Sequence, residues 1–321
     1  MNILFTGASS FTGYWFVKQL AEAGWKVTAT FTRKDGTVYA DGGVREQRVA
    51  RVQEFCSPVW DCRFGDEKFL DLLKSGDFEL LCHHAADVTD YKSPDFDCCG
   101  AISKNTRNLQ KVIEATRNIS EICDVPILLT QSVFAGGYGA GTLDEQGDPP
   151  HFSPYGLSKA ITADIFRYYC KEAGVPFREF VIPNPFGPYE EPRFTNYLMK
   201  TWFAGNQAGC NTPAYVRDNI HVELMARAYV QCAQELMADP DQNWTVGPHG
   251  YIETQGAFAE RFAAEMRKRL DLPCELELAH QTEFTEPRIR INVDTPDAEA
   301  LGFDEAKAWD DIAAFYKSLY G

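Results

Sequence analysis

The stretch that decides the fold is NILFTGASSFTG, residues 2–13. It begins with a short apolar run over residues 2–6, which is typical of a strand buried on both faces of a parallel sheet. A glycine-rich turn follows, then a helix predicted over residues 12–23 that Gly24 ends, and a second strand predicted over residues 26–32. A strand, a glycine-rich turn, a helix and another strand within about thirty residues are typical of a dinucleotide-binding unit.

The turn of this unit is the predicted site for a pyrophosphate. Gly7 permits the tight turn, and Gly13 lets the helix pack close to the strand. Backbone N–H groups at the start of the helix can bind the phosphate oxygens. The predicted phosphate-binding residues are Gly7, Ser9, Ser10, Phe11, Thr12 and Gly13. An ordinary strand-to-helix turn built of small residues is the alternative.

The end of the second strand bears on the choice of dinucleotide. A carboxylate at this position would bind the ribose 2′-hydroxyl of NAD. The sequence has Thr32, Arg33 and Lys34 there, and no acidic residue until Asp35. A hydroxyl and two cations can hold the 2′-phosphate of NADP, so NADP is favoured over NAD as the cofactor. A solvated basic loop is the alternative.

Strands and helices continue to alternate through the first half of the chain. Further strands are predicted over residues 78–82 and 126–129, with a long helix over residues 99–123 between them. This alternation predicts an α/β fold: a Rossmann-like doubly wound parallel sheet that binds its ligands at the carboxyl ends of its strands.

The same pattern divides the chain into two parts. Residues 1–187 are predicted to form the NAD(P)-binding Rossmann domain, and residues 216–248 return to it with a helix over residues 218–238. Residues 188–215 and 249–321 are predicted to form mainly a smaller C-terminal substrate-binding lobe, with helices over residues 194–204, 254–270 and 303–319.

A phenol and an ammonium share one face of a predicted helix that begins at Pro154 and ends at Gly174. Tyr155 and Lys159 are one turn apart. A cation ~4 Å from the phenol favours the phenolate by ~4 kcal/mol, or roughly three pKa units, which would bring the pKa of Tyr155 to about 7. A general acid or base works best when its pKa lies near the working pH, here about 7. Tyr14 and Lys18 have the same spacing, so an exposed helix pair is the alternative.

Two hydroxyls follow the strand predicted over residues 126–129. Thr130 lies 25 residues before Tyr155 and could hydrogen-bond a substrate oxygen beside that phenol. Ser132 would face the same side if the strand stays regular. A threonine at a strand end is also simply a good β residue. Two adjacent histidines, His83 and His84, end the strand before it and should point to opposite faces of the sheet, so a shared metal is not expected.

Composition excludes several classes of protein. A formal net charge of −15 disfavours nucleic acid and membranes as partners. The ten cysteines are scattered without a Cys-x-x-Cys pair, which fits neither a zinc site nor a disulfide scaffold, and no metal is predicted. The sequence shows no secretory signal and no long apolar run, so a cytoplasmic location is expected.

Together these features resemble the extended short-chain dehydrogenase/reductase family, in particular its nucleotide-sugar epimerase, dehydratase and reductase group. The matching stretches, in the family's order, are residues 6–13, 65–66, 83–86, 105, 130–134, 155–159, 183–188 and 217–222. The resemblance implies an NAD(P)-dependent enzyme that moves a hydride at a ring carbon of a nucleotide-activated sugar. It also implies a homodimer formed through the helices over residues 99–123 and 155–173.

The resemblance also implies residue roles. Tyr155 would be the catalytic acid or base, Thr130 would orient the substrate oxygen, and Lys159 would lower the pKa of the tyrosine and hold the nicotinamide ribose. The other implied cofactor-binding residues are Asp66 at the adenine, Ala85 and Asn105. The implied substrate-binding residues are Ser132, Asn184, Arg193, Arg217 at the diphosphate, and Arg288. Arg290 is the alternative to Arg288 as a second phosphate-binding arginine, and either could be a surface charge.

Departures from the family pattern reduce the number of reactions that the resemblance allows. Ser10 stands where the family has the middle glycine of the turn, so the backbone would approach the pyrophosphate less closely. Gln131 and Ser132 stand where the 4,6-dehydratase branch has the Asp-Glu pair that eliminates water, which argues against a sugar 4,6-dehydratase. Reduction of a 4-keto sugar and epimerisation are both open, and the missing acid after the second strand favours NADPH and reduction.

Two further alternatives are open on the same fold. One is a dehydrogenase or reductase of a small lipophilic ketone or alcohol, against which a diphosphate contact by Arg217 would argue. The other is a non-catalytic NADP-binding regulatory protein, in which the set of Tyr155, Lys159 and Thr130 would be expected to have decayed.

Overall fold

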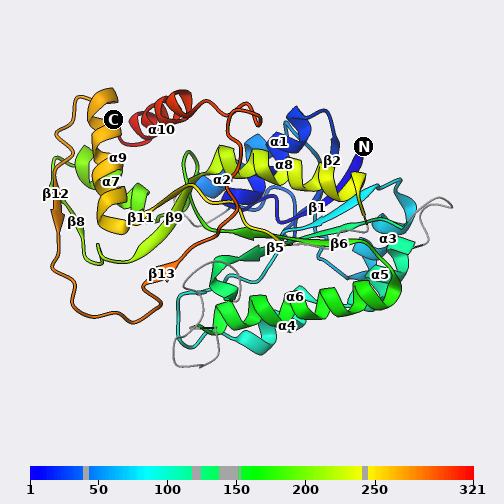
Figure 1. The fold of residues 1–321 in the computed structure, drawn as a ribbon. Coiled ribbons are helices and arrows are strands. Elements are labelled where there is room, and N and C mark those ends of the chain that lie inside the picture. Colours follow the sequence, from blue (N-terminus) through cyan, green and yellow to red (C-terminus); the bar gives the residue numbers. More distant parts are fainter. Residues whose placement is uncertain (39–42, 118–123, 137–150, 152, 241–244) are drawn as a thin grey trace.

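A seven-stranded parallel sheet with the strand order β10-β6-β5-β4-β1-β2-β3 lies at the centre of the molecule (Figure 1). The computed structural model describes residues 1–38, 43–117, 124–136, 151, 153–240 and 245–321. The strands are β1 (Asn2–Thr6), β2 (Lys26–Thr30), β3 (Ser57–Val59), β4 (Leu80–His83), β5 (Ile127–Ser132), β6 (Phe177–Ile182) and β10 (Thr245–Val246). The order reverses between β1 and β4, the switch point at which such sheets bind ligands. This topology confirms the predicted Rossmann-like fold.

Helices cover both faces of this sheet (Figure 1). One face carries α1 (Phe11–Glu22), α2 (Val44–Val52) and α8 (Val222–Ala238), and the other carries α3 (Glu67–Ser75), α4 (Cys98–Asn105), α5 (Leu109–Arg117) and α6 (Pro154–Ala173). Strand β1 therefore buries Ile3 and Phe5 on one side and Leu4 on the other, which explains its uninterrupted apolar run. In the described part of the chain, none of the helices combines the length and apolar character needed to cross a bilayer.

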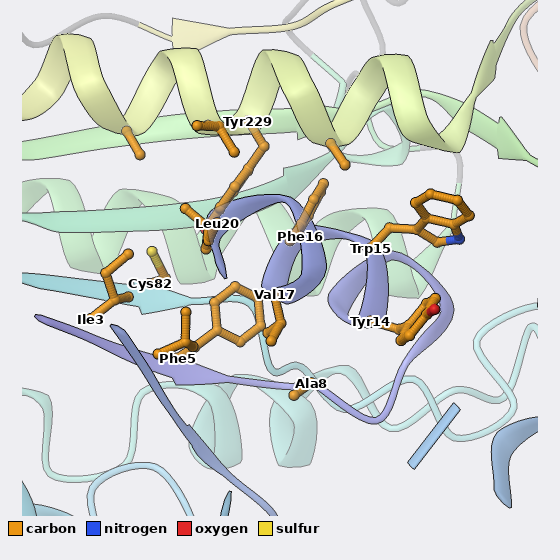
Figure 2. Packing of buried hydrophobic residues seen from close by; sticks show 14 of the residues in the cluster. Ile3, Phe5, Ala8, Tyr14, Trp15, Phe16, Val17, Leu20, Cys82 and Tyr229 are labelled. Carbon is orange, nitrogen blue, oxygen red and sulfur yellow. The ribbon is translucent and has the colours of Figure 1, made fainter. Parts of the chain in front are cut away.

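The core beneath α1 and α8 holds the glycine-rich turn in place. The rings of Phe16 on α1 and Tyr229 on α8 stack at 4.0 Å, and Phe5 of β1 packs edge-on against Tyr229 (Figure 2). Burying each such aromatic side chain stabilises the fold by roughly 1.5–3 kcal/mol. The strand before the turn and the helix after it are thus both packed against Tyr229 of α8.

A smaller body with its own core lies beside the carboxyl edge of the large sheet (Figure 1). Its sheet has the order β11-β9-β13, with β7 also paired to β9. Its elements are β7 (Asn184–Phe186), α7 (Phe194–Phe203), β8 (Ala208–Cys210), β9 (Val216–His221), β11 (Tyr251–Thr254), α9 (Gln255–Arg269), β12 (Leu276–Leu278), β13 (Ile289–Arg290) and α10 (Glu305–Tyr320). Most of these elements come from residues 188–215 and 249–321, but β7 and β9 lie in the ranges predicted for the Rossmann domain, and the division into domains stays a prediction.

Two predicted helices differ from the structure. The helix expected over residues 99–123 is interrupted between α4 and α5, where Asn108 takes a left-handed conformation with φ 49°. Its Nδ2 donates to the Gly65 carbonyl at 2.8 Å, which holds the chain out of the helix. Residues 118–123 lie outside the described residues. The helix expected over residues 218–238 begins only at Val222, because residues 216–221 form β9, which pairs with three other strands.

Candidate active site

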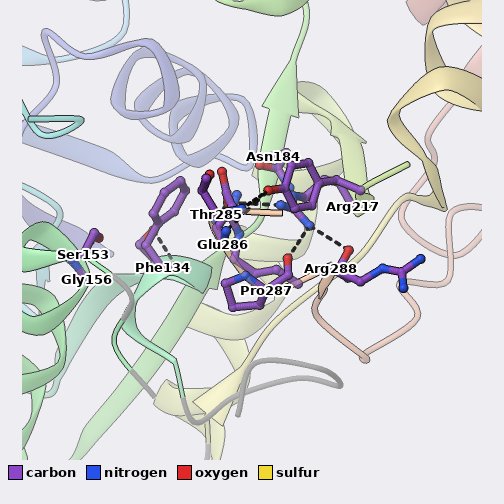
Figure 3. A network of polar contacts seen from close by, with 12 residues as sticks. Phe134, Ser153, Gly156, Asn184, Arg217, Thr285, Glu286, Pro287 and Arg288 are labelled. Carbon is purple, nitrogen blue, oxygen red and sulfur yellow. Dashed lines mark hydrogen bonds and ion pairs between the residues drawn. The ribbon is translucent and has the colours of Figure 1, made fainter. Parts of the chain in front are cut away.

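The start of α6 is packed against the end of β5. Ser153 caps the helix by accepting a hydrogen bond from the Gly156 N–H at 3.1 Å. A Cβ at Gly156 would lie 2.1 Å from the Phe134 carbonyl oxygen, so only glycine allows this approach. Figure 3 shows Ser153 and Gly156 beside Phe134. The first turn of α6, which carries Tyr155, is thereby fixed at the carboxyl edge of the sheet.

An aromatic wall surrounds the phenol of Tyr155. The rings of Tyr91, Phe96 and Phe134 lie 5.2, 5.8 and 6.0 Å from its own. Burial raises the pKa of Tyr155 to about 12, and the Ser132 hydroxyl and the Arg193 charge oppose this rise only in part. The phenol is therefore neutral at physiological pH. Sequence reasoning missed Tyr91 and Phe96, because nothing in a loop sequence marks a ring for this contact.

Lys159 is buried one turn further along α6, at 5% exposure. Its Nζ donates to the Thr130 carbonyl oxygen at 2.7 Å, and burial lowers the pKa of Lys159 to about 8. The expectation that this ammonium brings the pKa of Tyr155 down to about 7 is contradicted, because the effect of burial dominates and the pKa of the phenol rises instead.

The two hydroxyls of β5 lie in different surroundings. The Thr130 hydroxyl is buried near the phenol of Tyr229 on α8, and among the described residues it has no hydrogen-bond partner of normal geometry. The Ser132 hydroxyl instead faces Tyr155 and also accepts from the Phe134 N–H at 3.3 Å. Ser132 is therefore the hydroxyl with a contact to the phenol of Tyr155, and the predicted role of Thr130 beside Tyr155 stays a prediction.

The glycine-rich turn is compatible with a bound pyrophosphate. Gly7 has φ 87°, and a Cβ there would lie 2.8 Å from the Ala85 nitrogen. A Cβ at Gly13 would lie 2.2 Å from the Gly7 carbonyl oxygen. Ser10, in the position of the missing glycine, turns its hydroxyl inward as the cap of α1, accepting from the Gly13 N–H and donating to Gly7. The side chain thus leaves the helix start open toward a phosphate.

The paired histidines point to opposite faces of the sheet, as predicted. His83 contacts the Thr6 hydroxyl at 2.9 Å and stacks on Phe64 at 3.9 Å. Nε2 of His84 lies 3.0 Å from both the Ser10 and the Thr12 hydroxyls. Burial lowers the pKa of each imidazole to about 3, so both are neutral and serve to position the turn.

Two arginines of α2 reach the same turn, and sequence reasoning missed both. Nη2 of Arg45 donates to the Ser9 hydroxyl at 3.1 Å. Arg48, only 1% exposed, donates to the Ser9 carbonyl at 3.3 Å, to the Tyr189 carbonyl at 2.7 Å and to Glu191 at 3.0 Å. Arg48 therefore ties the turn to the segment over residues 189–191. The three residues expected at the 2′-phosphate, Thr32, Arg33 and Lys34, are all exposed.

The other predicted cofactor residues lie around β4 and α3. Asp66 caps α3, accepting from the Phe69 and Arg63 N–H groups at 3.1 Å each. The Ala85 N–H donates to the Thr6 hydroxyl at 3.0 Å. Asn105 accepts from the Asp87 N–H at 2.9 Å, while its Nδ2 is buried and has no partner within the part of the chain that the structure describes. That orphaned donor is available to a ligand.

Two buried arginines of the smaller body, Arg217 on β9 and Arg290 on β13, form what we call the arginine pair. The pair is joined by Glu286, whose Oε2 accepts from Arg217 at 3.0 Å and from Arg290 at 2.6 Å. The Arg290 guanidinium lies 3.9 Å from the centre of the Phe134 ring, so the pair lies next to the aromatic wall. Of the two sequence candidates, Arg290 belongs to this cluster.

The remaining predicted substrate residues are dispersed. Arg288 is exposed and points away from the pair, with its guanidinium over Phe284 at 4.4 Å (Figure 3). Asn184 donates to Asp218 at 3.0 Å beneath the pair. Burial raises the pKa of Asp218 to about 7. Arg193, at the start of α7, is close enough to Tyr155 for its charge to act on the phenol.

Comparison with known proteins places this geometry in a family. The profile of the NAD dependent epimerase/dehydratase family matches residues 3–247, well over half of the chain. Compared with curated protein sequences, the chain has no significant match.

Solved structures share the fold over the whole chain. The UDP-glucuronic acid 4-epimerase of Bacillus cereus, bound to UDP-glucuronic acid and NAD, is 15% identical with a TM-score of 0.73 over 100% of both chains. The UDP-glucose 4-epimerase of Thermotoga maritima, bound to UDP-glucose, is 17% identical with a TM-score of 0.69 over 100% of both chains. The dTDP-glucose 4,6-dehydratase of Streptomyces venezuelae, with NAD bound, is 17% identical with a TM-score of 0.71 over 99% of this chain and 97% of that one.

Proposed function

The chain belongs to the NAD dependent epimerase/dehydratase family, and on that premise we propose that it moves a hydride between a nicotinamide dinucleotide and a ring carbon of a nucleotide-activated sugar. One observation carries the proposal. The phenol of Tyr155 lies at the hydroxyl of Ser132 near the carboxyl end of β5, where the buried Lys159 donates to the Thr130 carbonyl, and Arg290 of the arginine pair lies over Phe134.

Three side chains have separate roles in the proposed proton transfer. The nicotinamide, when bound, supplies or accepts the hydride. Tyr155 is a neutral phenol that donates its proton to the sugar oxygen as negative charge develops there, and Ser132 donates a second hydrogen bond to that oxygen. Lys159, held on the Thr130 carbonyl, places a positive charge beside the reacting groups.

Net reduction of a keto sugar is the first candidate, because the basic residues after β2 favour NADPH as the hydride donor. The neutral phenol of Tyr155 is the form that protonates the alkoxide in this direction. Epimerisation is the second candidate, because the family name includes it and the same three side chains would serve it.

The arginine pair supports a diphosphate-bearing substrate. Guanidinium groups bind phosphate oxygens in a bidentate manner, and two of them side by side suit a diphosphate. Arg217 and Arg290 are 5% and 4% exposed, so they are held in place by the fold. Such buried charge would be costly next to a lipophilic ketone, which argues against that alternative substrate.

NADP is the proposed dinucleotide, and NAD is the alternative. Support for NADP comes from the basic residues after β2 and from Arg45 at Ser9. Arg33→Ala should weaken NADP more than NAD in a fluorescence titration, and equal effects on both would contradict the 2′-phosphate assignment. A homodimer, a cytoplasmic location and the lack of a nucleic-acid, membrane or metal partner also stay proposals.

The test is a screen of purified protein against UDP-, dTDP-, GDP- and CDP-sugars and their 4-keto derivatives. Stoichiometric loss of NADPH absorbance with a keto-sugar nucleotide would identify a reductase, and interconversion of sugars without net loss would identify an epimerase. Binding of none of these nucleotides in calorimetry would overturn the proposed function.

A further inference from the structure

The arginine pair is bridged by a carboxylate that belongs to the protein itself. A single oxygen of Glu286, Oε2, accepts from both guanidiniums, at 3.0 Å from Arg217 and 2.6 Å from Arg290. Figure 3 shows Glu286 beside Arg217. The side chains of Arg217 and Arg290 are 6% and 5% exposed, whereas that of Glu286 is 32% exposed. The anion thus lies at the outer side of the two buried cations.

The other groups around the pair include a second carboxylate, that of Asp218, whose charge acts on both arginines. Nη1 of Arg217 donates only to backbone carbonyl oxygens, of Val216 at 2.7 Å and of Pro287 and Arg288 at 3.2 Å each. The Arg290 guanidinium lies over the neutral ring of Phe134. Burial, and then the charge of Arg217, lowers the pKa of Arg290 to about 10, and the charges of Glu286 and Asp218 oppose this fall only in part.

We propose that Glu286 is an internal competitor of the substrate: its carboxylate occupies the arginine pair and leaves it when a nucleoside diphosphate binds there. This inference rests on the proposed function, because it takes the diphosphate as the natural ligand of the pair. One carboxylate oxygen offers each guanidinium a single acceptor, whereas a diphosphate offers several and can engage both in a bidentate manner.

The segment that carries Glu286 is built so that the side chain can move alone. The Tyr215 hydroxyl accepts from the Thr285 N–H at 2.8 Å and from the Glu286 N–H at 3.3 Å, so the backbone is anchored. The carboxylate is already partly in water, because 32% of the Glu286 side chain is exposed. Displacement therefore costs two charged hydrogen bonds, which the diphosphate replaces.

The prediction concerns affinity. Glu286→Gln keeps the shape of the side chain and an acceptor oxygen but removes the competing charge. We expect it to bind UDP about tenfold more tightly than the wild-type chain, or ~1.4 kcal/mol, in calorimetry at fixed pH and ionic strength. The matched control is Glu283→Gln on the same segment: Glu283 is exposed, and it changes net charge by the same amount at a distance from the pair. Its affinity for UDP should equal that of the wild type.

The outcomes separate the two proposals. Tighter binding in Glu286→Gln alone supports internal competition. Unchanged or weaker binding in Glu286→Gln, with binding that Arg217→Met abolishes, would overturn the competition and leave the proposed function standing. Equal tightening in both glutamine variants would also overturn it, because net charge would then be the cause. If the wild type and Glu286→Gln both fail to bind any of UDP, dTDP, GDP and CDP, the proposed function is wrong, and the inference that rests on it is wrong as well. Thermal melting of each variant verifies that it is folded.

Discussion

Replacement of Ser132 by alanine should lower kcat without unfolding the protein. Its hydroxyl faces Tyr155 and would donate to the sugar oxygen that gains negative charge in the transition state. Loss of one such donor costs about 10²–10³ in kcat. The same hydroxyl caps the short 3-10 turn over Val133–Ala135 at 3.3 Å, so its loss should cost roughly 0.5–1 kcal/mol of stability.

The matched control for this change is Thr130→Val, which removes a hydroxyl two residues away on the same strand. That hydroxyl is buried near Tyr229, and in the described structure it has no partner of normal geometry, so its removal should leave stability nearly unchanged. We expect kcat within about threefold of wild type, since a lost contact outside the reacting groups changes little. Steady-state kinetics with the nucleotide sugar found in the screen, together with urea unfolding, measure both quantities. A larger loss of kcat in Thr130→Val than in Ser132→Ala would refute the assignment of these hydroxyls.

Three further changes test other parts of the structure. Tyr155→Phe should abolish turnover while the dinucleotide affinity, measured by fluorescence titration, stays within a few fold, and retention of most activity would remove the phenol from the mechanism. Arg48→Met should cost about 1–3 kcal/mol in urea unfolding, because it leaves two carbonyls without their buried donor; a loss as small as that of the neighbouring Arg51→Met would contradict its bridging role. Burial raises the pKa of Glu190 to about 7, so the folded state holds this proton more tightly than the unfolded state does, and stability should fall as pH rises from about 4.5 to 7 by up to ~3 kcal/mol. Between pH 5 and pH 8 the decline in unfolding free energy should be smaller in Glu190→Gln than in the wild type, and parallel curves for the two proteins would contradict the shift.

The parts of the fold that could be predicted are those in which neighbouring residues decide the structure. Residues 2–13 combine an apolar strand, a glycine with positive φ and a helix cap within one short stretch, and all three are present. The bounds of α6, from Pro154 to the residue before Gly174, could be predicted equally well. Its start has a cap and a proline, and the glycine after its end is left-handed.

The parts that could not be predicted depend on contacts between distant segments. Alternation along β5 gave no means to choose between Thr130 and Ser132, because the strand ends at Ser132 and the chain turns there. The pKa of Tyr155 depends on burial by Tyr91, Phe96 and Phe134, which come from other segments, and this outweighs the charge of Lys159. Arg45 and Arg48 reach Ser9 across 36 and 39 residues, a distance over which spacing carries no signal.

Arg48 has a consequence for how two ligands change each other's affinity. One guanidinium holds both the glycine-rich turn, at Ser9, and the segment over residues 189–191 that leads to Arg193. A dinucleotide that makes the glycine-rich turn more rigid would therefore also restrict the segment over residues 189–191 beside the proposed sugar site, and a bound sugar would restrict the turn. Thermodynamic reciprocity requires each ligand to change the affinity of the other by the same factor, so cooperativity between the two sites would be mediated by one buried side chain.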